Sequence, residues 1–258
     1  MSQQKTAPNI NIRDVTLRYN DSNKPILNAL NMDIPASNWT CILGRSGCGK
    51  SSLLRYLASL LNTKVQFSGS LSTSSEIDLK EQVAYMAQQD LLMPWLTVLE
   101  NVLLSEKFST NTKKSQSDKQ QQMNKAKQLL QQVGLAGKET LLPQQLSGGM
   151  RQRVALARTL MQEKPIVLMD EPFSALDAVT RYRLQNLACE LLKDKTVVLI
   201  THDPQEAIRL ANQLYIMQGT PAFAEQLILP STTTPRNSDA QSAALQQTII
   251  ERLEADYE

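Results

Sequence analysis

The chain has 258 residues, enough for one large domain or two small ones. Its 27 Lys and Arg residues nearly balance 25 Asp and Glu residues, so the net charge of +2 lacks the basic excess typical of nucleic-acid-binding proteins. No run reaches the roughly 18 to 20 apolar residues that a membrane span requires, and the first residues lack the apolar centre of a signal peptide. Three widely spaced cysteines indicate reduced thiols. These features exclude a secreted, fibrous or membrane-spanning protein and favour a cytoplasmic enzyme or ATPase.

The first part of the chain has the patterns of short strands around one glycine-rich loop. Apolar and polar residues alternate over residues 10–19, which is typical of a half-buried strand. The glycine-rich run after residue 43 interrupts regular structure, and apolar residues then recur at helical spacing over residues 50–61. Further strands are predicted at residues 27–34, 39–44, 68–72 and 82–87. A strand, a glycine-rich loop and a helix are therefore expected in succession.

A polar segment of low complexity covers residues 105–122. We expect a surface loop there that leads into a helix at about 120–133. Its lysines allow a nucleic-acid patch as an alternative, but a solvated face is favoured because aromatic residues for base stacking are scarce.

The second half of the chain alternates strands with helices. Apolar runs at 166–170 and 196–201 are typical of strands that are buried on both faces of a parallel sheet. Residues 229–239 are interpreted as a linker. Helices are predicted at residues 147–161, 178–193 and 240–255. The alternation predicts an α/β core.

The residues from Gly44 to Ser51 match the P-loop pattern GxxxxGK[ST], with a chance glycine-rich turn as the alternative. Glycines let backbone N–H groups approach phosphates, and the following helix adds the positive end of its dipole. Lys50 would reach the β- and γ-phosphates, and the Ser51 hydroxyl would bind Mg²⁺. The other candidate ATP-binding residues are Tyr19, Gly44, Arg45, Ser46, Gly47, Cys48, Gly49 and Ser52.

Two carboxylates, Asp170 and Glu171, stand where the apolar run 166–170 ends. In a parallel sheet this strand end would lie beside the P-loop, which also follows a strand. Asp170 would then hold Mg²⁺ through water, and Glu171 would polarise an attacking water. Without a P-loop upstream, an acidic pair on the surface would be the simpler interpretation.

Ser147, Gly148 and Gly149 mark the start of the helix predicted at 147–161. Ser147 is a suitable N-cap, and the glycines leave the first amides of the helix bare, as in a phosphate site. An ordinary capped helix is the alternative. One nucleotide does not need two such sites in one chain, so the second would serve a neighbouring subunit.

Four further side chains are candidates with open alternatives. His202, the only histidine, follows the strand 196–201 and could bond a γ-phosphate or the attacking water, or could be a bystander. Gln88 could reach Mg²⁺ or water, or could be a surface glutamine. Tyr19 could stack on a purine or be an ordinary strand aromatic. A bulky group on Cys48 should block nucleotide, unless the thiol is inert.

In this order, Tyr19, GRSGCGKS, Gln88, LSGGMRQR, IVLMDEP, SALD and His202 resemble the ATP-binding subunit of ABC transporters. The resemblance covers about residues 9–217, and LSGGxRQR is highly specific. It implies a P-loop NTPase core with a parallel sheet, an N-terminal antiparallel β subdomain and an inserted helical subdomain at about 90–160 that carries the signature motif. The ATP-binding domain is expected at 9–220, followed by a short linker and helix at 221–258 without an added regulatory domain.

The resemblance also implies a role for each residue. Tyr19 would stack on adenine, Gln88 would link Mg²⁺ or water to the membrane partner, and Glu171 would be the catalytic carboxylate. His202 would be the switch histidine and Asp177 the D-loop aspartate. The signature residues, which would contact the ATP of the other subunit, are Ser147, Gly148 and Gly149.

The implied ligands are ATP and Mg²⁺, and the implied assembly lies on the cytoplasmic face of the inner membrane. A homodimer of ATPase subunits, or a heterodimer with a similar subunit, would drive transmembrane permease subunits and, indirectly, a solute-binding protein. No nucleic acid is expected. The apolar stretch around Pro94, Trp95 and Leu96 is the expected docking surface.

Residues 91–102 resemble a stretch of the nitrate, sulfonate and taurine importer group, which includes importers of thiamine pyrimidine precursors. The sequence AYMAQQDLL and the sequence of the segment near residue 230 look most like those of the hydroxymethylpyrimidine importers. A pyrimidine precursor is therefore the expected cargo, with sulfonate, taurine or nitrate as the alternative. A soluble ABC-type ATPase acting on nucleic acid or cluster assembly is disfavoured, because no coiled-coil insertion, tandem cassette or basic arm is visible.

Overall fold

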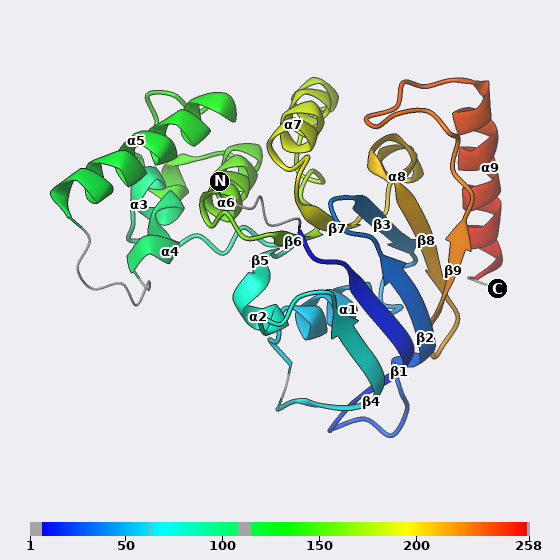
Figure 1. The fold of residues 1–258 in the computed structure, drawn as a ribbon. Coiled ribbons are helices and arrows are strands. Elements are labelled where there is room, and N and C mark those ends of the chain that lie inside the picture. Colours follow the sequence, from blue (N-terminus) through cyan, green and yellow to red (C-terminus); the bar gives the residue numbers. More distant parts are fainter. Residues whose placement is uncertain (1–6, 62, 108–114, 257–258) are drawn as a thin grey trace, which may run out of the picture. The chain divides into compact units, whose positions relative to one another are not determined.

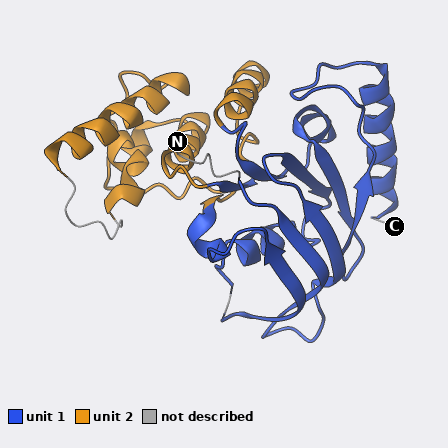
Figure 2. Ribbon diagram, in the orientation of Figure 1, with its two compact units in different colours: residues 1–83, 165–171, 192–258 blue, residues 84–164, 172–191 orange. Residues whose placement is uncertain are grey.

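The computed structural model describes residues 7–61, 63–107 and 115–256 (Figure 1). The chain divides into two compact units (Figure 2). Unit 1 combines the residues up to 83 with 165–171 and those from 192 onward, and unit 2 combines 84–164 with 172–191. Unit 1 therefore contains the P-loop, the two carboxylates and His202. Unit 2 contains Gln88, the signature residues and Asp177.

An antiparallel sheet of strand order β2-β1-β4 belongs to unit 1. Its strands are β1 (Ile10–Tyr19), β2 (Leu27–Ile34) and β4 (Val65–Thr73). The predicted half-buried strand is confirmed, because Ile10, Ile12, Val15 and Leu17 are all buried. The register shifts between Ile12 and Val15, where Asp14 has a φ of 50°. This irregularity keeps Val15 on the buried face despite its odd spacing from Ile12.

The second sheet of unit 1 has β6, β7, β3, β8 and β9 side by side in that order. The strands are β3 (Trp39–Gly44), β6 (Ile166–Asp170), β7 (Thr196–Ile200), β8 (Gln213–Gln218) and β9 (Phe223–Leu227). The first four are parallel, and β9 is antiparallel to β8. Every residue of β6 and β7 is buried, which confirms the prediction from their apolar runs. The carboxyl ends of β3, β6 and β7 therefore share one edge of the sheet.

Four helices lie in the described part of unit 1, and three of them depart from the sequence analysis. Helix α1 (Lys50–Leu57) ends four residues earlier than predicted, because Ser59 takes a left-handed φ of 58° and the Leu60 N–H bonds back to Arg55. Helix α9 (Ala240–Ala255) has the predicted bounds. The sequence analysis missed α2 (Leu79–Gln82) and α8 (Pro204–Leu210), which are too short to show helical periodicity.

The segment predicted as a linker, residues 229–239, is held in place by one buried side chain. Arg236 donates hydrogen bonds to the carbonyl oxygens of Ile208, Ala211 and Pro230. Asp239 then caps α9 by accepting a hydrogen bond from the Ser242 N–H at 2.7 Å. The linker is therefore a fixed connection between β9 and α9.

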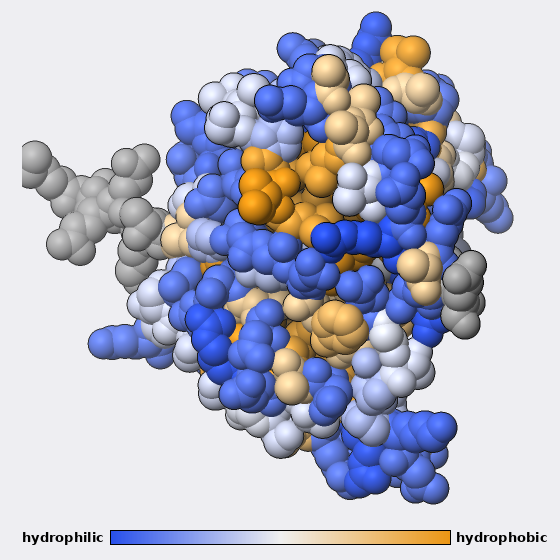
Figure 3. Space-filling model, turned by 90° about the vertical axis from the view of Figure 1, so that its right-hand side faces the viewer, coloured by the Kyte–Doolittle hydropathy of each residue, from blue (hydrophilic) through white to orange (hydrophobic). Residues whose placement is uncertain are grey.

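On the face shown in Figure 3, hydrophilic residues predominate and enclose patches of hydrophobic ones.

Unit 2 begins within β5 (Val83–Met86) and is otherwise helical. Its packing centre is formed by α3 (Val98–Val102), α5 (Gln116–Gln132) and α6 (Gly148–Met161). Its other helices are α4 (Leu104–Lys107), the 3₁₀ turn η1 (Pro143–Gln145) and α7 (Ala178–Leu191).

The prediction of a loop at 105–122 is wrong for most of the residues in this range that the structure describes. Residues 108–114 lie outside the described residues, but α4 and α5 occupy much of the rest. Helix α5 begins at Gln116, four residues before the predicted start, because Ser115 and Asp118 form a capping box.

The observed elements confirm the predicted α/β fold class, with parallel strands, a separate antiparallel sheet and a helical unit that carries the signature residues. Among the residues described above, no helix is both long enough and apolar enough to cross a membrane.

Candidate functional site

The P-loop joins β3 to α1, and its glycines meet two different demands. A Cβ on Gly44 would lie 2.4 Å from the carbonyl oxygen of Met217 in β8, so packing against the sheet excludes a side chain there. Gly47 has a φ of 83°, and a Cβ placed on it would meet nothing within 4 Å. Its glycine is needed for the backbone conformation and leaves open space above the loop. The loop is thus anchored at its base and accessible at its turn.

Lys50 is buried at the centre of this loop. Its Nζ donates to the carbonyl oxygens of Gly44 and Arg45, each at 2.7 Å. The third donor of the ammonium faces the Cys48 sulfur at 3.9 Å, a weak acceptor that a phosphate oxygen would outcompete. The charge of Lys50 is therefore fixed in position for an anion in the loop.

A pocket of about 210 Å³ adjoins the P-loop. The Tyr19 hydroxyl lies 2.9 Å from the Ser52 hydroxyl, which ties β1 to the first turn of α1. The pocket is lined by Tyr19, Ser22, Lys24, Pro25, Ile26, Gly47, Cys48, Gly219 and Thr220. An aromatic ring and apolar side chains beside a phosphate-type loop suit the base of a nucleotide.

Asp170 and Ser51 form a polar pair, and a divalent cation would fit beside it. Asp170 is 1% exposed, and its carboxylate is hydrogen-bonded to the Ser51 hydroxyl. Burial raises the pKa of Asp170 above 3.8, although the Ser51 bond opposes the rise. Its Oδ2 is buried without a hydrogen-bond partner in the described part of the chain. A hydrated Mg²⁺ would satisfy this oxygen.

Within residues 7–61, 63–107 and 115–256, no group of three or more His, Cys, Asp and Glu side chains is arranged to bind a metal ion. Mg²⁺ that binds with a nucleotide usually takes most of its ligands from phosphate oxygens and water.

Glu171 and His202 meet at the same edge of the sheet. Glu171 Oε2 lies 3.1 Å from His202 Nδ1, and the two side chains are 17% and 63% exposed. Glu171 has a φ of 50°, which is unusual for a residue with a Cβ, and its N–H donates to the Ile200 carbonyl at 2.9 Å. This strained turn directs the carboxylate toward the end of β7, where His202 follows.

The signature residues and Asp177 lie in unit 2. Ser147 caps α6 by accepting a hydrogen bond from the Met150 N–H at 3.3 Å. A Cβ on Gly149 would lie 3.2 Å from the Ala175 carbonyl oxygen, so the start of α6 packs against the SALD segment. Asp177 accepts a hydrogen bond from the Thr180 N–H at 2.9 Å, and this bond lowers the pKa of Asp177. Gln88 is exposed in the same unit.

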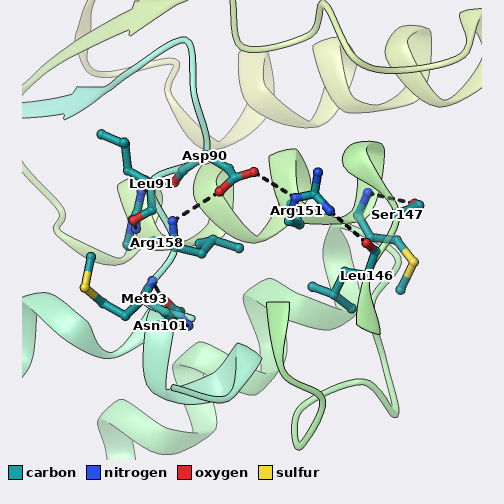
Figure 4. A network of polar contacts seen from close by, with 10 residues as sticks. Asp90, Leu91, Met93, Asn101, Leu146, Ser147, Arg151 and Arg158 are labelled. Carbon is teal, nitrogen blue, oxygen red and sulfur yellow. Dashed lines mark hydrogen bonds and ion pairs between the residues drawn. The ribbon is translucent and has the colours of Figure 1, made fainter. Parts of the chain in front are cut away.

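A polar network that the sequence analysis missed fixes residues 90–97 within unit 2 (Figure 4). Arg158 donates to the carbonyl oxygens of Asp90 and Leu91 at 2.6 and 2.8 Å. Arg151 bonds the Asp90 carboxylate and the Leu146 carbonyl, both at 2.9 Å. Both arginines lie on α6, and their spacing of seven residues on one helix face is the signal that could have identified them.

Asn101 anchors the other end of this segment. It is fully buried, accepts a hydrogen bond from the Met93 N–H at 2.8 Å and donates to the carbonyls of Met93, Leu96 and Thr97. Within the fixed loop, Leu91 and Trp95 are 54% and 71% exposed. The structure therefore holds two large apolar side chains in solvent on an ordered support.

The geometry of unit 1 defines a P-loop nucleotide-binding core, and comparison with known proteins agrees. The model of the ABC transporter family matches residues 27–174. An uncharacterized ABC transporter ATP-binding protein of Haemophilus influenzae is 40% identical over 249 residues, which cover 95% of this chain and 98% of the relative. The aliphatic sulfonates import ATP-binding protein SsuB 2 of Streptomyces avermitilis is 38% identical, covering 84% of this chain and 80% of the relative.

A solved structure supports the same assignment. The dimeric post-hydrolysis structure of the ATP-binding cassette MJ0796, bound to ADP and Pi, matches with a TM-score of 0.73 and 28% identity. The match covers 86% of this chain and 100% of that chain. The chain belongs to the ABC transporter family, and its core is an ABC ATPase domain, as the sequence analysis predicted.

Alkylation of Cys48 tests the surroundings of the P-loop. Burial raises the pKa of this thiol above 9.0, with the Lys50 charge opposing the rise, so its reactive thiolate is scarce at neutral pH. N-ethylmaleimide should therefore modify Cys48 more slowly than the partly exposed Cys189 at pH 7, and about tenfold faster for each unit of pH increase. Peptide mapping by mass spectrometry measures both rates in one sample.

ATP should protect Cys48 and leave Cys189 unchanged, because Cys48 lines the pocket beside the P-loop. Equal modification of Cys48 with and without saturating ATP would contradict the placement of the nucleotide.

Proposed function

We propose that this chain is the ATP-hydrolysing subunit of an importer and energises transport through a separate transmembrane permease. The observation that carries the proposal is the Glu171–His202 pair at 3.1 Å, on the sheet edge where the P-loop and Asp170 also end. The name of the Streptomyces relative, an import ATP-binding protein, supports the direction of transport.

ATP would bind with its base against Tyr19 and its phosphates in the P-loop. The backbone N–H groups from Gly44 to Ser52 would surround the phosphates, and the third donor of Lys50 would reach the β- and γ-phosphates. Ser51 would bind Mg²⁺ directly, Asp170 would bind it through water, and Gln88 would be a further oxygen ligand. When bound, Mg²⁺ neutralises phosphate charge.

Glu171 would be the general base of hydrolysis. A water oxygen attacks the γ-phosphorus in line, the bond from phosphorus to the β–γ bridging oxygen breaks, and the Glu171 carboxylate accepts a water proton. His202 would fix the Glu171 carboxylate through Nδ1 and remain accessible to the γ-phosphate, because its side chain is 63% exposed. Its contact with Glu171 would thus make it the sensor of the γ-phosphate.

The signature residues would act on the ATP of a second subunit. Ser147, Gly148 and Gly149 leave the first amides of α6 available, and a Cβ on Gly148 would meet only Arg151 Nη2 at 3.9 Å. Asp177 would lie in the same interface, since its loop packs against Gly149. A homodimer would then contain two complete sites. The solved cassette MJ0796 is itself described as dimeric.

The permease would dock on the apolar side chains of residues 90–97. Leu91 and Trp95 are exposed, yet the hydrogen bonds of Arg158 and Asn101 keep their loop fixed. Exposed apolar residues on an ordered support are typical of an interaction site. The chain would therefore sit peripherally on the cytoplasmic face of the inner membrane, and a solute-binding protein would act through the permease.

We propose an organic sulfonate or a related small solute as one cargo class and a thiamine pyrimidine precursor as the other. The name of the Streptomyces relative and a similarly named relative of Mesorhizobium japonicum, 37% identical, favour sulfonates. The pyrimidine precursor stays a prediction from the sequence AYMAQQDLL and from the segment near residue 230.

Replacing Glu171 tests the catalytic role. Glu171→Gln should reduce ATP hydrolysis by about 10² to 10⁴-fold, because the amide cannot accept the water proton, while ATP binding is retained. A phosphate-release assay and size-exclusion chromatography with ATP should show an inactive, ATP-bound dimer. Glu76→Gln, which changes an exposed carboxylate of the same unit, is the control. Hydrolysis at the wild-type rate in Glu171→Gln would refute the assignment.

Replacing Trp95 tests the docking surface. Trp95→Ala should leave the ATPase activity of the isolated subunit unchanged and should weaken co-purification with its permease by about tenfold or more, as for an aromatic anchor. Leu60→Ala, which removes a 56% exposed apolar side chain from unit 1, should change neither measurement. Retention of the permease by Trp95→Ala would place the docking surface elsewhere.

Growth of a deletion strain tests the cargo. The strain should lose growth on one of two compounds, an alkanesulfonate as sulfur source or a hydroxymethylpyrimidine as thiamine precursor, and the wild-type gene should restore that growth. The Glu171→Gln gene should not restore it, because import requires hydrolysis. Loss of growth on one compound alone assigns the cargo class, and normal growth on both would reject the two proposed classes.

A further inference from the structure

The side chain of Arg45, within the P-loop, is bound to the end of helix α9. Its Nε lies 3.2 Å from Asp256 Oδ2, its Nη1 donates to the Asp256 carbonyl at 2.9 Å, and its Nη2 donates to the Thr220 hydroxyl. The side chains of Arg45 and Asp256 are 26% and 11% exposed, so solvent screens this pair less than an ordinary surface pair.

Asp256 also holds a second wall of the nucleotide pocket. Its Oδ1 accepts a hydrogen bond from the Gly219 N–H at 2.7 Å. Gly219 and Thr220 form the turn between β8 and β9 and line the same pocket as Gly47 and Cys48. One carboxylate therefore connects the P-loop, through Arg45, to the turn on the other side of the pocket.

Local helix preference does not explain a carboxylate at this position. The carboxyl end of a helix carries partial negative charge, so an aspartate there is disfavoured in isolation. Helix α9 already has an N-cap at Asp239 and a fully buried residue, Ile249, in its middle. The cost at Asp256 is offset by Arg45 and Gly219, which are distant in sequence. An aspartate that is unfavourable for its own helix, but is bound by residues distant in sequence, points to a role in the site.

We propose that the Arg45–Asp256 pair, called the α9 clasp below, positions the P-loop and the 219–220 turn for ATP, so that α9 sets nucleotide affinity. Both are positioning residues, and the inference rests on the proposed binding of ATP in the P-loop. Without the clasp, the two pocket walls lose their common anchor, and binding must include the free energy of ordering them.

The direction in which Asp256→Ala changes nucleotide affinity distinguishes a positioning role from an effect of charge alone. Removing a negative charge near the phosphate site would by itself strengthen the binding of ADP or ATP. Loss of positioning instead weakens it. We expect a five- to tenfold higher Kd for ADP and KM for ATP, by about the factor typical of coupled sites, with kcat within about twofold of wild type. Calorimetry and steady-state kinetics on the full chain give these values.

A double-mutant cycle and a matched control complete the test. Arg45→Ala should raise Kd similarly, and the double variant should be no weaker than either single variant, because the clasp is already broken. Arg252→Ala removes an exposed ion pair with Glu225, 2.7 Å long, from the same helix and should leave Kd unchanged. If Asp256→Ala does not fold, Asp256→Asn, which keeps the shape, should still show a higher Kd.

A readout without nucleotide keeps this inference separate from the proposed function. Asp256→Ala should speed the alkylation of Cys48, because its charge raises the pKa of that thiol and its bonds order the adjoining loop. Unchanged or tighter ADP binding, additive losses in the double variant, or unchanged alkylation would overturn the clasp. If the wild type binds neither ADP nor ATP, the proposed function fails, and alkylation alone decides on the clasp.

Discussion

Parallel pairing of β3, β7 and β6 in one register brings the chemistry of unit 1 together. Ile200 in β7 pairs with Ile42 of β3 on one side and with Asp170 of β6 on the other. The P-loop, the two carboxylates and His202 therefore leave the sheet at the same level. A slip by one residue would displace Asp170 by about 3.3 Å and separate it from Ser51. All three strands are fully buried, and this burial opposes such a slip.

The P-loop is held from several directions, so the nucleotide site depends on the whole of unit 1. Lys50 bonds the carbonyls of its own loop, Tyr19 ties the first turn of α1 to the antiparallel sheet, and Gly44 packs against β8. Asp256 adds a contact from α9, more than two hundred residues along the chain. A loop that must present its amides to phosphate cannot spend them on regular secondary structure, and these contacts supply the order instead.

Helix α6 connects the two features of unit 2 that the proposed function uses. Ser147 caps its start, where the signature amides are exposed, and further along Arg151 and Arg158 fasten the loop that carries Trp95. In the proposed cycle, a change at the signature of one subunit would therefore move the permease-docking loop of the same subunit through a single rigid helix. Asn101 makes that loop a poor hinge, because four hydrogen bonds to a buried amide are costly to break.

The sequence by itself determined the buried strands, the P-loop and the two carboxylates at the end of β6, because period-2 patterns, apolar runs and glycine spacing are local properties of the chain. It placed α9 correctly but ended α1 too late and replaced the start of α5 with a loop, since helix ends depend on caps and turns. Only the tertiary structure decided that Glu171 meets His202, that Arg45 turns to Asp256 and that Asn101 holds residues 93–97. These contacts join residues whose separation in sequence carries no periodic signal, and the fold alone brings them within hydrogen-bonding distance.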